Sequence, residues 1–182
     1  RQIRIFVSIL TRIDFINKKI GMNVFSYLYF FLCMIINIPL KAISIDEEGF
    51  HLFVKIKING KSANMLLDTG ASKTVFDINR ISHFLKNKTD SFESFDKLST
   101  GLGTSTMQSS FTLLKEIKLD HLKLKNYTAI LLDMKHVNQS YEMIKLKPIE
   151  GVIGSDLLMK YNAVIDYQKK NLKLRIATSD LQ

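Results

Sequence analysis

The feature that most constrains this chain of 182 residues is an alternating stretch that ends in a tight turn. One face of the stretch carries Leu52, Val54, Ile56 and Ile58, and the other carries His51, Phe53, Lys55 and Lys57. A period of two residues predicts a β-strand. Asn59-Gly60 follows it, and this pair strongly favours a β-hairpin because both residues tolerate positive φ. A returning strand over residues 63–67 then leads into Asp68.

Further short apolar segments, separated by turn residues, continue to the end of the chain. They predict strands over residues 75–77, 98–100, 104–108, 111–119, 122–132, 148–153, 163–167 and 172–176. Ser155 can cap a short helix over residues 156–161, with Asp156 in its first turn. The pattern leaves the structure of residues 135–147 open. Many short strands with one clear helix predict an all-β, barrel-like domain.

The composition is that of one globular domain, with 46% hydrophobic and 24% charged residues. The single Cys excludes a disulfide framework and a Cys-based zinc cluster. His51, His83, His121 and His136 are scattered without metal-ligand spacing, so surface or packing roles are expected and no metal or cofactor is predicted.

The net charge of +9 is unevenly distributed. Residues 1–44 contain six Lys or Arg and one acidic residue, so they hold more than half of the excess. The remainder of the chain is mildly basic, with Lys and acidic residues interspersed, and it has no Arg-rich run or Gly-rich phosphate loop. We therefore expect no nucleic-acid partner.

The N-terminal quarter resembles an export or anchoring segment. Residues 24–36 are uncharged, and apolar character continues to Leu40. Basic residues precede this run, and Ala42-Ile43-Ser44 has the small-x-small form of a cleavage site. We predict a signal peptide or membrane anchor over residues 1–44, with membrane attachment through residues 24–40, and a domain over residues 45–182. The protein is then exported, periplasmic or attached to the cell envelope. A buried helix or strand of a soluble domain is the open alternative for this run.

The segment with the clearest chemical content is Asp68-Thr69-Gly70-Ala71-Ser72, which directly follows an apolar strand. A lone carboxylate in apolar surroundings is costly, so its pKa is expected to rise unless it is paired. Gly70 allows a tight turn, and Thr69 and Ser72 can supply hydrogen bonds. The arrangement suits a carboxyl group for acid–base catalysis, although an Asp-Gly-type turn at a strand end gives the same pattern.

At this motif the chain resembles the retropepsin-like aspartic proteases, which include retroviral proteases and single-domain bacterial relatives. Residues 149–158, with Gly151 and Gly154, look like the family's apolar-apolar-Gly strand and the helix after it. Residues 160–167 and 169–174 are similar to the bacterial branch. The resemblance covers about residues 48–177. It implies an all-β, closed retropepsin-like barrel with one short C-terminal helix.

The resemblance also implies a mechanism. Asp68 is the expected catalytic residue, and Thr69, Gly70, Ala71 and Ser72 form the active-site loop. Two aspartates share one proton and activate a water for hydrolysis of a peptide bond, without a metal or cofactor. Asp77, Asp156 and Asp166 lack the context of a second catalytic aspartate. The second carboxylate is then expected from another copy of the chain, in a symmetric homodimer that takes a protein or peptide substrate.

Family members also cover the substrate with a flap, for which Gly101, Leu102, Gly103 and Thr104 are the candidate residues. Two glycines around one apolar residue suit a mobile tip that contacts an extended peptide. An ordinary glycine turn is the alternative for this segment. For the domain as a whole, the alternative to an aspartic endopeptidase is a non-catalytic module of the same fold that binds a peptide or a partner chain.

Overall fold

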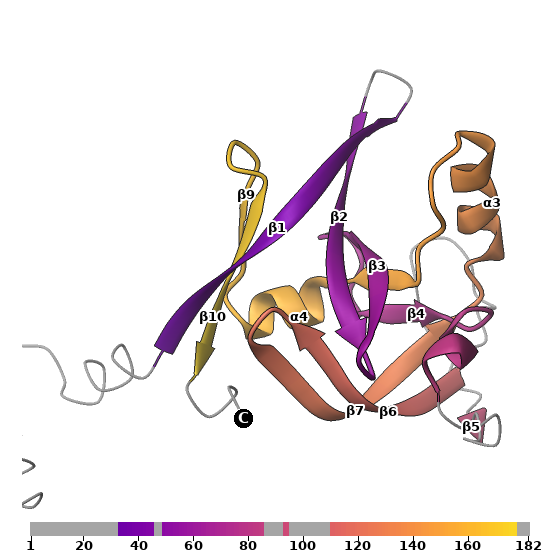
Figure 1. Ribbon diagram of the computed structural model, residues 1–182, viewed down its shortest axis with the longest axis horizontal. Helices are drawn as coiled ribbons and strands as arrows, with labels where there is room; N and C mark the ends of the chain where they lie inside the picture. Colours follow the sequence, from indigo (N-terminus) through magenta and orange to yellow (C-terminus); the bar gives the residue numbers. More distant parts are fainter. Residues whose placement is uncertain (1–32, 46–48, 86–92, 95–109, 178–182) are drawn as a thin grey trace, which may run out of the picture.

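A computed structural model describes residues 33–45, 49–85, 93–94 and 110–177 (Figure 1). The strands are β1 (Cys33–Ile45), β2 (Gly49–Ile58), β3 (Lys61–Leu67), β4 (Val75–Asp77), β5 (Glu93–Ser94), β6 (Ser110–Leu119), β7 (Leu122–Leu132), β8 (Gly151–Ile153), β9 (Val164–Asp166) and β10 (Asn171–Ala177). The helices are α3 (Lys135–Met143), α4 (Ser155–Lys160) and a short 3-10 turn, η1 (Ile81–Phe84).

The β2–β3 hairpin forms as the alternation predicts. The two strands pair antiparallel from Ile58↔Lys61 to Leu52↔Leu67, and the turn places Asn59 and Gly60 at φ 48° and 84°. The four aliphatic side chains of the predicted inner face are all buried. Phe53, on the predicted polar face, is buried as well, with only 3% of its surface exposed. This end of β2 is therefore covered on both faces.

Six strands close into a barrel. The hydrogen-bonded order runs β6-β7-β4-β8-β3-β2, and β2 pairs with β6 through Lys57↔Lys118 and Ile58↔Ile117. Most pairs are antiparallel, but β3 with β8 and β4 with β7 are parallel. The prediction of an all-β, closed barrel is confirmed. Strands β1, β10 and β9 extend the sheet beyond β2, as the ribbon shows on the left of the view (Figure 1).

The barrel encloses the main core, which is built from aliphatic side chains on alternate positions of the strands. Its fully buried members include Ile58, Met65, Phe76, Leu114, Ile117 and Leu131. Helix α4 adds Leu157 and Leu158 to the same core. Burial of side chains of this size contributes about 1.5–3 kcal/mol each, so the closed barrel supplies most of the hydrophobic stabilisation.

Several local predictions are confirmed. The predicted strands 111–119 and 122–132 are β6 and β7, and Asp120 takes a positive φ of 52° in the turn between them. The last two predicted strands are β9 and β10. The predicted strands 98–100 and 104–108 lie outside the described residues, as do Gly101, Leu102, Gly103 and Thr104 of the candidate flap.

Two helix predictions need correction. Ser155 does not cap α4: Gly154 takes the N-cap position, and the hydroxyl of Ser155 donates to the carbonyl of Ala71 instead. The short C-terminal helix is joined by a second helix, α3, in the segment that the pattern left open. Helix α3 carries few apolar side chains, and the residues that it buries are Asn138 and Tyr141, so no apolar stripe marks the helix in the sequence.

Tertiary hydrogen bonds fix α3 in place. The side chain of Asn138 donates to Asp77 Oδ2 at 2.9 Å and pairs with both backbone groups of Ile149. The carboxylate of Asp77 is 1% exposed and also accepts from the backbone amides of Asn79 and Met134. A second, smaller core then forms under the helix from Phe53, Met134, Tyr141, Ile149 and Val152.

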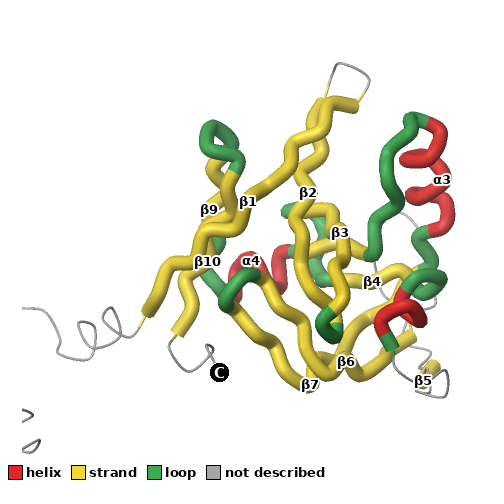
Figure 2. The backbone as a smooth tube through the Cα atoms, viewed as in Figure 1, coloured by secondary structure: helices red, strands yellow, loops and turns green. Residues whose placement is uncertain are grey.

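The N-terminal apolar run is partly a strand of the domain. β1 pairs with β10 over residues 33–39 and with β2 over residues 40–45 (Figure 2). Ile36, Ile38 and Leu40 are buried in the main core. Residues 33–44 therefore follow the alternative that the sequence left open, and the described domain begins 12 residues before the predicted boundary.

The packing of β1 in the main core has a consequence for the predicted membrane attachment. Membrane attachment through residues 24–40 would compete with the burial of Ile36, Ile38 and Leu40. In the part of the chain that the structure describes, no helix is long and apolar enough to cross a membrane. Export and an envelope location stay predictions.

Removal of residues 1–44 is expected to destabilise the domain severely, whereas removal of residues 1–32 leaves the described sheet complete. The longer truncation deletes β1 and three buried side chains, each worth about 1.5–3 kcal/mol. Their sum is comparable to the whole stability of a typical domain, about 5–15 kcal/mol. Thermal unfolding followed by circular dichroism compares the two truncated chains with the full chain. Equal midpoints for both truncated chains would show that β1 is dispensable.

Candidate active site

Asp68 stands where β3 ends, at the start of the loop that the sequence singled out. Its backbone amide donates to the carbonyl of Ile153 in β8 at 3.1 Å, so the parallel β3–β8 pairing continues to the first loop residue. The amide of Gly70 donates to Asp68 Oδ1 at 2.8 Å. A Cβ at Gly70 would lie 3.2 Å from the same oxygen, which explains a residue without a side chain at this position.

The loop is fastened to the segment that follows β8. Both the backbone amide and the hydroxyl of Ser155 donate to the carbonyl of Ala71, at 2.8 and 3.0 Å. Gly154 packs against the loop backbone so closely that an added Cβ would lie 2.5 Å from the carbonyl carbon of Lys73. Residues 68–72 and 149–158, the two segments that carry the family resemblance, are therefore in direct contact.

A buried network under the loop was not expected from the sequence. Thr74 is 1% exposed, and its amide and hydroxyl both donate to Asp156 Oδ1 at 2.8 Å. The Thr74 oxygen in turn accepts from the amide of Gly154 at 3.0 Å. Asp156 does lie in the first turn of α4, as predicted, and also accepts from the Leu157 amide. Its additional role is to join α4 to the end of the loop.

The charge of Asp156 affects a neighbouring tyrosine. Burial, together with this negative charge, raises the pKa of Tyr127 to about 12, while a hydrogen bond with Thr74 opposes the rise. Tyr127 therefore stays protonated at all physiological pH values. It is therefore a neutral side chain beside the charged group of Asp156.

The loop itself is open to solvent in the single chain. Asp68, Thr69, Gly70 and Ser72 are exposed, and Ala71 is half-buried. The expectation that Asp68 is buried in apolar surroundings is thus wrong for one copy, because β3 ends at Leu67 and the loop turns away from the core.

Other aspartates of the described residues are occupied elsewhere. Asp77 accepts hydrogen bonds that hold α3, and Asp156 those that hold the loop. Asp166 ends β9 just before the last turn: it accepts from the Lys169 amide at 2.9 Å and pairs with Lys173 at 3.2 Å. The backbone hydrogen bond from Lys169 is the main reason that the pKa of Asp166 is lowered. None of the three has the geometry of a second catalytic aspartate.

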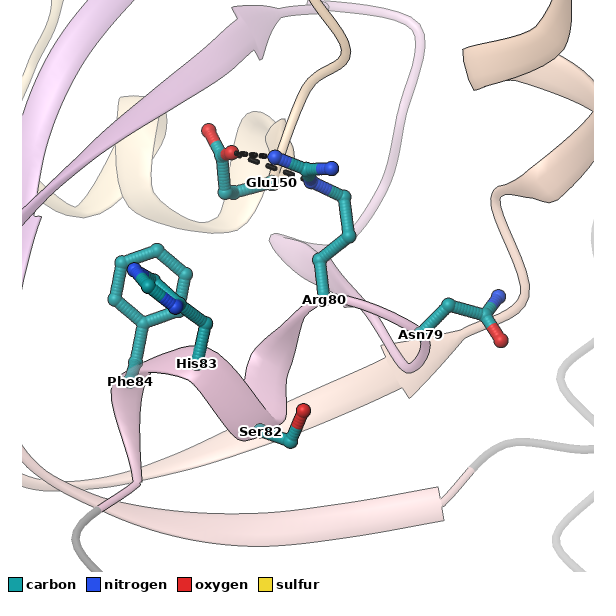
Figure 3. Close-up of a pocket in the computed structure, with 6 residues that line it drawn as sticks. All are labelled: Asn79, Arg80, Ser82, His83, Phe84 and Glu150. Carbon is teal, nitrogen blue, oxygen red and sulfur yellow. Dashed lines mark hydrogen bonds and ion pairs between the residues drawn. The ribbon is translucent and has the colours of Figure 1, made fainter.

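A pocket at the other end of β8 is structural in character. Its cavity of about 260 Å³ is lined by Asn79, Arg80, Ser82, His83, Phe84 and Glu150. Figure 3 shows the guanidinium of Arg80 directed at the carboxylate of Glu150, at 2.6 Å. The second oxygen of Glu150 accepts from the amide of Asn64 at 2.6 Å. This ion pair joins η1 to β3 and to the start of β8. It lies at the opposite end of β8 from the Asp68 loop, which contacts the residues that follow β8.

In the described ranges, no three His, Cys, Asp or Glu side chains gather where they could hold a metal ion.

Comparison with known families and structures gives one match by sequence and several by fold. The family model described as "Aspartyl protease" matches residues 54–157. Among solved structures, a retropepsin-like aspartic protease from Rickettsia conorii is 17% identical, with a TM-score of 0.48 over 80% of this chain and 92% of that one. The protease of EIAV, solved with the inhibitor HBY-793, is 19% identical, with a TM-score of 0.44 over 65% and 93%.

The retroviral protease-like domain of Ddi1 from Leishmania major is 13% identical to this chain, with a TM-score of 0.45 over 72% of this chain and 98% of that one. No curated protein sequence matches this chain.

Replacement of Gly154 by Ala is expected to destabilise the fold by about 1–3 kcal/mol, because the new Cβ would displace the backbone of the Asp68 loop. Gly49→Ala is the matched control, since no described atom lies within 4 Å of its added Cβ. That control is expected to change stability by less than about 0.5 kcal/mol. Urea unfolding measures both variants, and equal midpoints would contradict the close packing at Gly154.

Proposed function

The chain belongs to the aspartyl protease family, and on that premise we propose that it is an endopeptidase with Asp68 as its catalytic residue. The observation that carries the proposal is the position of this carboxylate. It follows β3 directly, is held by the Gly70 amide, and is exposed on a loop that β8 and α4 support. Thr69, Gly70, Ala71 and Ser72 shape that loop.

The proposed reaction uses two carboxylates and one water. Like charges about 3 Å apart do not both ionise readily, so a pair of aspartates shares one proton. The ionised carboxylate takes a proton from the water, and the water oxygen attacks the carbonyl carbon of the peptide bond. The protonated carboxyl donates to the carbonyl oxygen. Transfer of a proton to the leaving nitrogen then completes the hydrolysis, with no cofactor.

The second carboxylate is proposed to be Asp68 of another copy. The sequence contains one Asp-Thr-Gly motif, and the aspartates Asp77, Asp156 and Asp166 already have other partners. A twofold axis next to the loop brings two identical carboxylates together, which is the arrangement of an isologous dimer. The exposure of Asp68 and Thr69 in the single chain supports this proposal, because the loop is free to meet its counterpart.

Replacement of Asp68 by Asn is expected to lower peptide cleavage by at least about 10²-fold, because the general base is lost. Asp120→Asn is the matched control: it makes the same chemical change in the exposed β6–β7 turn, and activity should be retained. Cleavage of a peptide library is measured for both variants together with their circular dichroism. Wild-type rates in the Asp68 variant would exclude the proposed mechanism. Peptide binding without cleavage by the wild type would favour the binding module.

If two copies share one active site, a mixture of wild-type and Asp68→Asn chains should lose activity. When a ninefold excess of the Asp68→Asn chain is equilibrated with wild type, the activity per wild-type chain should fall about tenfold, because most wild-type chains enter dimers with one carboxylate. An equal excess of the Asp120→Asn chain should cause no loss. Sedimentation of the same samples reports the oligomeric state. A strictly monomeric, active protein with no inhibition by the variant would overturn the shared site.

A further inference from the structure

The register of the β2–β3 hairpin, extended by one residue, brings a histidine opposite Asp68. The last registered pair of the β2–β3 hairpin is Leu52↔Leu67, so one further step of the same register sets His51 opposite Asp68. Opposite residues of an antiparallel pair have Cβ atoms about 4.5–5.5 Å apart and project to the same face. Leu52 and Leu67 face the main core, so His51 and Asp68 project to the other side of the sheet.

The imidazole of His51 is held in one orientation. Its Nδ1 atom lies 2.8 Å from the hydroxyl of Tyr141 on α3. The ring of Tyr141 meets the rings of His51 and Phe53 edge to face, with centroid separations of 5.7 and 5.8 Å. Tyr141 is 4% exposed, whereas His51 is half-buried. The helix thus presents a buried phenol that fixes a partly accessible imidazole.

The support of Tyr141 is itself rigid. One turn earlier in α3, Asn138 is bonded to Asp77 and to Ile149, and the Leu146 amide donates to the Tyr141 carbonyl at 2.8 Å. These contacts fix the position of the Tyr141 side chain relative to β2. The orientation of the His51 imidazole therefore depends on the buried carboxylate of Asp77, through helix α3 and Tyr141.

The direction of the hydrogen bond between Tyr141 and His51 sets the tautomer of His51. Burial, and after it the negative charge of Asp68, raise the pKa of the Tyr141 hydroxyl, so the phenol keeps its proton. A buried hydroxyl needs an acceptor, and Nδ1 of His51 is the partner that lies within reach. When the phenol donates to Nδ1, the remaining ring proton is on Nε2. Nε2–H is then a hydrogen-bond donor beside the proposed catalytic carboxylate.

We propose that His51, positioned by Tyr141, is a specificity-determining residue that favours peptides with a carboxamide side chain next to the cleaved bond. This inference rests on the proposed function, because the substrate must lie across Asp68. A Gln or Asn oxygen accepts from Nε2–H. A carboxylate of the substrate would also accept, but it would be repelled by the charge on the aspartate pair. An aliphatic side chain of similar size would leave the donor without a partner.

The test compares peptides that differ only in Gln, Glu or Leu at each position around the cleaved bond. At one position the wild type should cleave the Gln peptide with a kcat/KM at least about tenfold above the Leu peptide, and the Glu peptide no better than the Gln peptide. His51→Phe should abolish this ratio. Tyr141→Phe keeps the ring packing but loses the hydroxyl, so it should reduce the ratio with little change in thermal stability.

His121→Phe is the matched control, since His121 is exposed in the β6–β7 turn and its loss should leave the ratio unchanged. A ratio that is the same in wild type, His51→Phe and Tyr141→Phe would overturn the inference. Affinities of the same peptides for Asp68→Asn and for Asp68→Asn with His51→Phe separate this inference from the proposed function. A Gln preference lost with His51 supports the inference even if cleavage does not depend on Asp68, and equal affinities overturn it.

Discussion

The structure depends above all on the contact between the residues that follow β3 and those that follow β8; these two strands form one of the two parallel pairs of the barrel. Asp68 continues the ladder to Ile153, and Ser155 closes over Ala71 immediately afterwards. No side chain fits between these segments at Gly154. The backbone of one segment thereby fixes the backbone of the other. The carboxylate that we propose to act on peptides is therefore positioned by main-chain hydrogen bonds and by a short buried network, rather than by a pocket.

That buried network gives the loop its polar support. Thr74 uses its amide, its hydroxyl proton and its oxygen in three separate hydrogen bonds, all with the segment after β8. Buried polar groups stabilise only when they are satisfied, and here each group has a partner. Such a network specifies one arrangement of the loop. It leaves the exposed side of Asp68 available for a second copy and a substrate.

Much of the fold could be predicted because it is local. The β2–β3 hairpin follows from the alternation and from Asn59-Gly60, and β6 and β7 follow from two apolar strands around Asp120. Helix α3 could not be predicted in this way, since Asn138 and Asp77, which fix it, are 61 residues apart. The strand character of β1 was hidden for a related reason: its outward positions Ile35 and Pro39 also carry apolar residues, so the run resembled a membrane segment.

The candidate site, like the fold, could be predicted from the sequence only in part. Asp68 and its loop could be singled out from a short motif, and residues 149–158 from resemblance, but their contact was not predicted. The roles of Thr74 and Tyr141 could not, because a single Thr or Tyr carries no signal until the fold brings its partner near. His51 was assigned a surface or packing role for the same reason. What the sequence lacked in each case was a pairing between residues more than 70 positions apart.

The two-sided pairing of β1 also has a consequence for biosynthesis. Its first half pairs with the last strand of the domain, so Cys33 meets Ala177 across 144 residues of chain. Closure of so long a loop is entropically unfavourable until many other contacts exist, and it is impossible before the C-terminal strand has left the ribosome. The sheet is therefore completed after translation of the domain ends. Incomplete chains lack the β10 ladder, so the first half of β1 has no β10 to pair with until that strand has been synthesised.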